Sequence, residues 1–263
     1  MNRQRTTNSL NLVHLGEGSG TGTSNYAKMY NNPLSNLTDD FSISFWVKPD
    51  YLYSTGFHGI VQLGVTASNF CAIGTDTSGH IIAAYEVSGS YPTRFNTGAS
   101  SISLTEWSHV VVCFSSGTHT GSNNASVLTD SAATWTADEL IDGQVHNVTD
   151  SGSTSAAGSA KITDNAATTI TGTLGGGTED DWDTSDVYRV MKVYINGVAN
   201  DVNDDDDTGA PDAVGIDGSY LVGADNSSGR MLNGEVDDVS IYSKWLTAVE
   251  VKRNYNAGKR SHR

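Results

Sequence analysis

Residues 230–255 have the sequence R-M-L-N-G-E-V-D-D-V-S-I-Y-S-K-W-L-T-A-V-E-V-K-R-N-Y, and this stretch decides the fold. Alternating apolar residues in its first half predict a β-strand within a packed sheet. We expect Val239 and Ile241 to share one face of that strand. Val236 and Tyr242 are expected on the opposite face. A glycine-led strand with two apolar faces indicates a sandwich interior rather than an exposed ribbon.

The second half of the stretch predicts a short helix. Thr247 is followed three residues later by Glu250, the capping-box spacing in which the two residues satisfy each other's backbone N–H groups. Gly258 is placed to close the helix, since glycine readily adopts the left-handed conformation of a C-terminal cap.

The composition favours an all-β protein with many short strands. The chain has 263 residues, with 28 glycines and only 4 prolines. That length allows one large β domain, or a β domain that carries a second module. Polar turn residues separate short apolar runs, which is typical of antiparallel sheets.

Two further runs are strong strand signals. In residues 41–47, Phe41, Ile43, Phe45 and Val47 alternate with Ser42, Ser44 and Trp46, and Pro49 is expected to end the strand because it cannot donate to a ladder. Residues 104–114 place Trp107 and His109 before a continuous apolar run, which indicates a central strand. The dipeptide Asn196-Gly197 predicts a hairpin turn, because both residues tolerate positive φ.

Four motifs occur in the order found in laminin-G-like domains of the concanavalin A-like lectin/glucanase type. They are F-S-I-S-F-W-V-K-P-D, E-W-S-H-V-V-V-C-F, M-K-V-Y-I-N-G-V and L-N-G-E-V-D-D-V-S-I-Y. The chain resembles this family over roughly residues 9–117 and 188–257. The resemblance implies a two-sheet antiparallel jelly-roll sandwich with a short C-terminal helix, a fold that hosts lectins, glycosidases and structural modules.

The chain departs from that pattern between Phe114 and Val190, where about 70 residues replace a short hairpin. Short apolar runs separated by Gly, Asp and Asn turns predict a small inserted β module. We therefore divide the chain into a discontinuous sandwich, residues 1–117 and 188–263, and an inserted acidic module, residues 118–187. The amino-acid sequence of the insert resembles segments of predicted bacteriophage and environmental viral proteins.

The charge is strongly negative and unevenly distributed. The formal net charge is −15, and residues 118–187 hold 11 acidic side chains against 1 basic one. An acidic surface repels phosphate backbones, so nucleic acid is not an expected partner; the alternative role of the charge is solubility. No apolar run approaches the roughly 18 residues of a membrane span, and the first residues lack the apolar core of a secretory signal.

The two cysteines, Cys71 and Cys113, lie in apolar strand-like runs. Two cysteines do not form a disulfide framework, so two buried thiols are expected.

Glu235 and Asp237 raise the question of a glycosidase. Retaining glycosidases use two carboxylates, and alternate residues of a strand share a face, so E-x-D-x-E or E-x-D-x-x-E can place them. The third position of the motif falls on Val239 or Ser240. Neither residue transfers a proton usefully, and the sequence therefore favours a non-catalytic protein.

Zinc is not expected, because the seven histidines are scattered without metal-ligand spacing. Calcium is the more plausible ion, because clustered loop carboxylates suit hard cations. The candidate ligands are Asp204, Asp205, Asp206, Asp207 and Asp212, with a solvated acidic loop as the alternative.

Exposed aromatic rings would be needed to bind carbohydrate, and several occur in turn-rich stretches. The candidates are Tyr51, Tyr53, Tyr91, Trp135 and Trp182, each of which could equally close one end of the sandwich.

The sequence thus predicts a non-enzymatic structural or interaction protein. The viral resemblance favours a virion component, either a capsid decoration protein or a tail or fibre adhesin; an extracellular or cell-surface protein is the alternative location. Partners would be other virion subunits, surface glycans or further copies of the chain. A carbohydrate-binding module, with or without calcium, is the alternative function. Candidate assembly contacts are the basic residues Arg3, Arg5, Lys259, Arg260 and Arg263.

Overall fold

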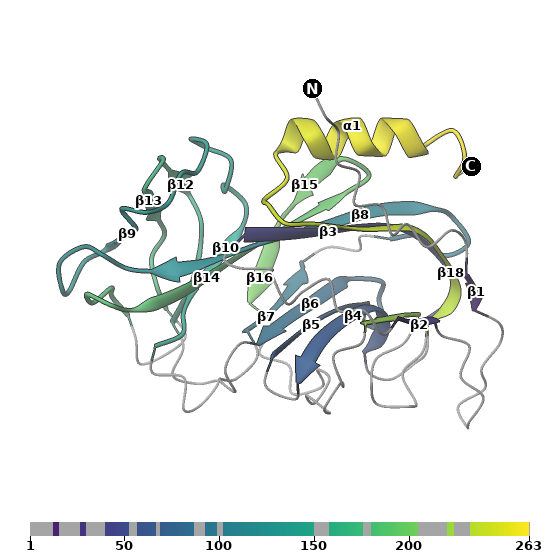
Figure 1. Cartoon of the computed structure of the whole chain (residues 1–263), viewed down its shortest axis with the longest axis horizontal. Helices are drawn as coiled ribbons and strands as arrows, with labels where there is room; N and C mark the ends of the chain where they lie inside the picture. The colour runs from purple at the N-terminus through teal and green to yellow at the C-terminus, as the bar shows by residue number, and fades with distance from the viewer. Residues whose placement is uncertain are drawn as a thin grey trace.

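A computed structural model describes most of the chain. The described residues are 13–15, 27–29, 40–52, 57–66, 69–86, 93–98, 102–149, 158–175, 180–204, 220–223 and 232–262. They form two large antiparallel sheets that face each other, with one helix lying on the outer side of the upper sheet (Figure 1). The prediction of an all-β sandwich with a short C-terminal helix is therefore confirmed.

The larger sheet has eight strands in the order β1-β18-β3-β8-β14-β10-β11, with β15 also paired to β14. Its strands are β1 (Val13–Leu15), β18 (Asn233–Tyr242), β3 (Asp40–Tyr51), β8 (Ser108–Thr118), β14 (Val187–Ile195), β10 (Gln144–Asn147), β11 (Gly158–Lys161) and β15 (Val198–Asn200).

The facing sheet has seven strands in the order β16-β7-β6-β5-β4-β17-β2. Its strands are β16 (Val202–Asp204), β7 (Thr93–Thr97), β6 (Ile81–Glu86), β5 (Asn69–Thr75), β4 (His58–Thr66), β17 (Tyr220–Val222) and β2 (Ala27–Met29).

The main core fills the space between the two sheets. The apolar side of β3 points into it through Phe41, Ile43, Phe45 and Val47, as the alternation predicts, and Ser42, Ser44 and Trp46 take the outer side. The predicted hairpin also forms, with Asn196 at φ 53° and Gly197 at φ 75° between β14 and β15.

Strand β18 differs from the predicted alternation. Its pairing with β3 shifts register between Asp237 and Ser240, where Asp238 has φ 50°. This bulge inserts an extra residue, so Val236 and Val239 both point into the main core and not to opposite faces. The prediction of alternate faces for these valines was wrong, because sequence alternation carries no mark of a bulge formed by an aspartate.

Pro49 does not end its strand. β3 continues to Tyr51 and pairs with β18 alone at this end, since its pairing with β8 stops at Val47. A Cβ on Gly234, opposite Pro49, would lie 2.3 Å from the Lys48 carbonyl oxygen. Pro49 has no N–H to donate to the ladder. Strand β3 can continue past it because its partner on β18, Gly234, lies at a second register shift and has no side chain to clash.

Helix α1 (Ala248–Gly258) begins with the predicted capping box of Thr247 and Glu250, which is confirmed. Its end differs from expectation, because Gly258 is the last helical residue and Lys259 caps the helix in a right-handed conformation. Gly258 serves a close approach instead: a Cβ there would lie 2.5 Å from Nε1 of Trp46.

The described residues 119–149, 158–175 and 180–186 lie between two adjacent strands, β8 and β14, and in part extend and in part cover the same sheet. Their β10 and β11 extend the eight-stranded sheet beyond β14. Three other strands, β12 (Asp164–Asn165), β13 (Thr169–Thr171) and β9 (Val127–Thr129), form a small separate sheet. The division of the chain at residues 118 and 187 stays a prediction.

A second core lies beneath this small sheet. It contains the buried residues Leu128, Leu140, Val145, Ala160, Ile162, Ile170, Leu174, Trp182, Tyr188 and Val190. Trp245, just before α1, packs against both this core and the cluster beneath the helix. Trp245 therefore lies where the core beneath the small sheet meets the cluster beneath α1 on the outer face of the large sheet.

Near Trp245, Glu139 connects the segment between β8 and β14 to strand β14 and to helix α1 by hydrogen bonds. Its backbone carbonyl oxygen accepts a hydrogen bond from Nζ of Lys192 at 2.6 Å. Its carboxylate accepts hydrogen bonds from the Tyr194 hydroxyl at 3.1 Å and from the backbone N–H of Ala248, in the first turn of α1, at 2.7 Å. A carboxylate at the helix N-terminus is electrostatically favourable.

Both cysteines are free and buried, as predicted. Burial raises the pKa of the Cys113 thiol to about 12, so the thiolate is disfavoured at neutral pH. Within the described part of the chain, no helix has the length and apolar character needed to cross a membrane.

Candidate functional site

The two carboxylates of β18 that suggested a glycosidase are both paired within the protein. Glu235 lies opposite Lys48 on β3, and Oε1 of Glu235 is 2.8 Å from Nζ of Lys48. The hydrogen bond to Glu235 raises the pKa of Lys48. Val239, the first candidate for the third carboxylate position, is buried in the main core. Glu235 and Asp237 therefore both have structural partners: Lys48 contacts Glu235, and His262 contacts Asp237.

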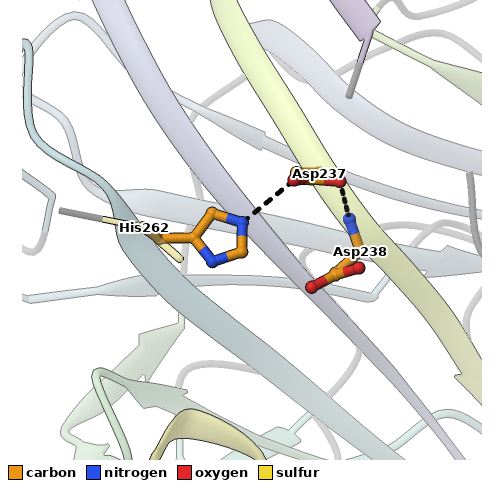
Figure 2. A group of neighbouring side chains, drawn as sticks. All are labelled: Asp237, Asp238 and His262. Carbon is orange, nitrogen blue, oxygen red and sulfur yellow. Dashed lines mark hydrogen bonds and ion pairs between the residues drawn. The ribbon is translucent and has the colours of Figure 1, made fainter. Parts of the chain in front are cut away.

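Asp237 belongs to the one group of described residues that combines histidine and carboxylates at ligand spacing. Its Oδ2 atom lies 3.0 Å from Nε2 of His262, and its Oδ1 atom accepts the backbone N–H of Asp238 at 2.7 Å. Figure 2 shows His262 reaching β18 from the segment that follows α1, while both aspartates come from the bulged strand. One ligand atom from each residue lies within 4.8 Å of the others.

The His262 ring is enclosed by aromatic side chains. It stacks on Trp46 with ring centroids 4.3 Å apart and planes 5° apart. Trp107 meets it edge to face at 4.8 Å. The side chain of His262 is only 3% exposed. This histidine therefore fixes the segment after α1 against the outer face of the sheet.

His109 also contacts Trp46, with ring centroids 5.0 Å apart and planes tilted by 46°. Burial, together with the nearby charge of His262, lowers the pKa of His109 from 6.5 to about 4. Its Nε2 atom is 3.0 Å from the Ser44 hydroxyl, and its Nδ1 atom has no hydrogen-bond partner among the described residues. The lowered pKa favours the neutral form of the buried His109 ring at neutral pH.

Burial, and secondly the charge of Asp237, raise the pKa of Asp238, which is the exposed member of the group. One imidazole and two carboxylates are a donor set suited to zinc rather than to calcium, which takes six to eight oxygen ligands. A metal ion here would have to replace the contact between Asp237 and His262.

The predicted calcium site lies almost wholly outside the described residues. Asp204 is the last residue of β16, and only its backbone is described. Asp205, Asp206, Asp207 and Asp212 lie beyond the described residues. Calcium binding by these residues stays a prediction.

The aromatic candidates for glycan binding are dispersed. Tyr51 is 51% exposed at the end of β3. Trp182 is 1% exposed inside the second core, and half-buried Trp135 packs edge to face on Tyr188 at 5.9 Å. Trp182 therefore presents no open face, whereas Trp135 remains half-exposed. Tyr53 and Tyr91 lie outside the described residues.

Of the predicted assembly contacts, Lys259 and Arg260 are described and exposed. Nζ of Lys259 lies 5.3 Å from the centre of the Tyr255 ring. Arg3, Arg5 and Arg263 lie outside the described residues.

Sequence reasoning missed the association of His262, Trp46 and Trp107. In the sequence, His262 is one of seven scattered histidines and has no metal-ligand spacing to any other. The usable signal was the alternation in β3, which already placed Trp46 on the outer face. The pairing of Trp46 with Asp237 depends on the bulged register of β18.

Comparisons with known proteins agree with the architecture. The model of the concanavalin A-like lectin/glucanases superfamily matches residues 21–139 and again residues 121–252. No curated protein matches the chain.

Several solved structures are similar to the chain at low sequence identity and low TM-score. The heptameric SAP-like pentraxin from Limulus polyphemus is 11% identical, with a TM-score of 0.43 over 92% of this chain and 79% of that one. The CBM40 of Ruminococcus gnavus IT-sialidase, solved with α2,3-sialyllactose, is 9% identical, with a TM-score of 0.47 over 94% of this chain and 97% of that one.

The binding domain of botulinum neurotoxin serotype G is 11% identical, with a TM-score of 0.47 over 90% of this chain, and the chain spans only 41% of the toxin domain's length. At such identities the likeness concerns the fold alone. The family model, by contrast, covers most of the sequence, and the chain belongs to the concanavalin A-like lectin/glucanases superfamily.

Proposed function

We propose that this protein is a non-enzymatic interaction and structural protein built on a lectin-like sandwich. The observation that carries the proposal is that Glu235 and Asp237, the two carboxylates of the incomplete glycosidase motif, are both paired within the protein. Glu235 is paired with Lys48, and Asp237 is paired with the enclosed His262. A general acid or nucleophile must be able to reach its substrate, and these groups instead hold neighbouring elements in place.

The alternative of a retaining glycosidase requires two carboxyl groups roughly 5–5.5 Å apart, on either side of a sugar. The inward direction of Val239 removes the third position of the motif from the outer face. The test is hydrolysis of a panel of β-glucans by the unmodified protein and by Glu235→Gln. We expect no turnover by either protein. Turnover by the unmodified protein that Glu235→Gln abolishes would contradict the proposal.

The setting that we propose is a virion, with the protein as a capsid decoration or as a tail or fibre adhesin. The viral resemblance of residues 118–187 and their acidic composition support this setting. Exposed Lys259 and Arg260 offer a basic surface to a neighbouring acidic subunit or to another copy of the chain.

Particles banded in a density gradient and analysed by mass spectrometry test the virion setting. The protein is expected to band with capsid proteins. Its recovery only from the particle-free fraction would contradict this role and would favour an extracellular or cell-surface protein.

Carbohydrate binding is the second candidate, and the exposure of Tyr51 favours it. Tyr51 is 51% exposed at the end of β3, and an exposed aromatic side chain can stack on a sugar. A glycan array, probed with and without a chelator, tests the candidate together with the predicted calcium. Signal that Tyr51→Ala removes supports it, with Val198→Ala on β15 as a control at another exposed site. An array without signal in either condition contradicts it.

A further inference from the structure

Three side chains that can ligate a metal converge where the segment after α1 meets β18 (Figure 2). Nε2 of His262 lies 3.0 Å from Oδ2 of Asp237. A carboxylate oxygen of Asp238 completes a group whose ligand atoms all lie within 4.8 Å of one another. The histidine follows α1 and both aspartates belong to β18, so the group joins two elements that are distant in the sequence.

The bulge in β18 brings both carboxylates to one histidine. Adjacent residues of a regular strand point to opposite faces of the sheet. Here the register shifts between Asp237 and Ser240, and Asp238 has φ 50°, so two neighbouring carboxylates approach the same ring. Burial, and secondly the charge of Asp237, raise the pKa of Asp238. A divalent cation between the two carboxylates would offset their repulsion.

Neighbouring backbone groups and Trp46 orient two of the three ligands. Nδ1 of His262 lies 2.9 Å from the carbonyl oxygen of Gly258, which can only accept a hydrogen bond, so Nδ1 donates and Nε2 faces the carboxylates. The ring also stacks on Trp46, with planes 5° apart. Oδ1 of Asp237 accepts the backbone N–H of Asp238 at 2.7 Å, and Oδ2 is directed at Nε2. Metal-bound histidines are held in the same way, with the second ring nitrogen donating to a backbone carbonyl.

The distances in this group need little change to fit a zinc ion. Zinc binds imidazole nitrogen and carboxylate oxygen at about 2.0–2.2 Å, so two ligand atoms of a tetrahedral site lie roughly 3.3–3.5 Å apart. The contact of 3.0 Å between Nε2 and Oδ2 would have to open by about 0.3–0.5 Å. The His262 side chain is 3% exposed and that of Asp237 20%, while Asp238 is exposed, so an ion can enter from the carboxylate side. The ion displaces any proton on Nε2, so the fit does not depend on the protonation of the free ring.

We propose that Asp237, Asp238 and His262 form a zinc site that fastens the segment after α1 to β18. The ion replaces one hydrogen bond by three metal–ligand bonds, and its remaining coordination position is open to water. Calcium is a poor competitor, because it takes six to eight oxygen ligands and this group includes an imidazole. The proposal does not depend on the virion or glycan hypotheses.

Calorimetric titration of the metal-free, full-length protein with zinc chloride at pH 7 tests the site. We expect one zinc ion to bind here with a dissociation constant on the order of 10 µM, because only three protein ligands hold it. Zinc at about 0.1 mM should raise the melting temperature by about 3 °C relative to the protein in EDTA. Calcium at the same concentration should not displace the zinc.

Two variants each remove one ligand. His262→Gln keeps a hydrogen-bond donor for Asp237, and Asp238→Asn changes an exposed side chain at a positive φ that asparagine tolerates, so both should fold. Each is expected to weaken zinc binding at least about tenfold. His80→Gln is the matched control, because His80 lies 2.6 Å from Asp76 but belongs to no group of three ligands among the described residues. It should bind zinc as the unmodified protein does.

No zinc binding to the unmodified protein up to about 1 mM would overturn the proposal. Zinc binding that either His262→Gln or Asp238→Asn retains in full would also overturn it, because the ion would then be held elsewhere, such as by the acidic residues that follow β16. Nitrogen NMR gives a reading that needs no variant. Zinc should shift the Nε2 signal of His262 while Nδ1 keeps its hydrogen, and an unchanged Nε2 signal at saturating zinc would contradict the site.

Discussion

Residues 119–186 and residues 245–262 both cover the outer face of the eight-stranded sheet, but different kinds of contact hold them there. The first covering rests on a continuous apolar core that includes Leu128, Ile170 and Trp182. The second rests on a few specific contacts, because Val251 is the one buried residue of α1 and the remaining anchors are polar or aromatic. Apolar burial depends on area, whereas the second covering depends on charge and on precise contacts.

The two coverings should differ in how readily they leave the sheet. Loss of the apolar core under the small sheet would expose a large apolar surface, so that covering should leave the sheet only on unfolding. The helix and the segment after it are held by groups that titrate or can be displaced. We therefore expect the first covering to contribute more to the free energy of unfolding, and the second to respond more to changes in pH.

Trp182→Ala should give the largest effect, a loss of about 3–5 kcal/mol in the free energy of unfolding, because it opens a cavity in the second core. Urea denaturation followed by circular dichroism measures this loss. Trp135→Ala is the control, since Trp135 is only half-buried, and it should cost clearly less. Equal losses for the two variants would contradict the continuous core beneath the small sheet.

The second covering should be sensitive to acid through His109. Burial and the charge of His262 lower its pKa to about 4 in the folded protein, from 6.5. Between these two values the unfolded chain binds more protons, so the free energy of unfolding falls as the pH falls from 6.5 to 4. The contribution of this one residue is on the order of 3 kcal/mol across that window.

Urea denaturation at pH 7 and at pH 4.5 checks this contribution against His109→Gln, which does not titrate. The variant should lose less stability on acidification than the unmodified protein. An identical loss in both proteins would show that His109 is not the responsible group.

Thr247→Ala should give the smallest effect, about 1 kcal/mol, because it removes the N-cap of α1 and leaves the sheet intact. Thermal unfolding measures it. Thr247→Ser, which retains a hydroxyl for the cap, should lie close to the unmodified protein. A loss several times larger would mean that α1 contributes more to the fold than its few contacts suggest.

The sequence predicted those parts of the fold that follow local rules. The alternation in β3 placed Phe41 and Trp46 on their correct faces, the Asn196-Gly197 turn formed, and Thr247 begins α1. These features depend on neighbouring residues alone, which is why one sequence suffices for them.

Features that depend on distant partners could not be predicted. The bulge at Asp238 turns Val239 inward, and Gly234 allows the strand to pass Pro49. The enclosure of His262 needs both this register and the close approach of Gly258 to Trp46. Histidine in a polar terminal segment gives no sign of burial until the sheet that receives it is known.

The most direct test of the central claim is to measure the stability and the activity of Asp237→Asn in parallel with the unmodified protein. The substitution retains size and removes charge, so the free energy of unfolding should fall by about 1–2 kcal/mol, because the enclosed His262 loses its carboxylate hydrogen-bond partner. Neither protein should hydrolyse any of the β-glucans tested. Hydrolysis by the unmodified protein, abolished in an Asp237→Asn variant of unchanged stability, would instead make this carboxylate catalytic and contradict the account.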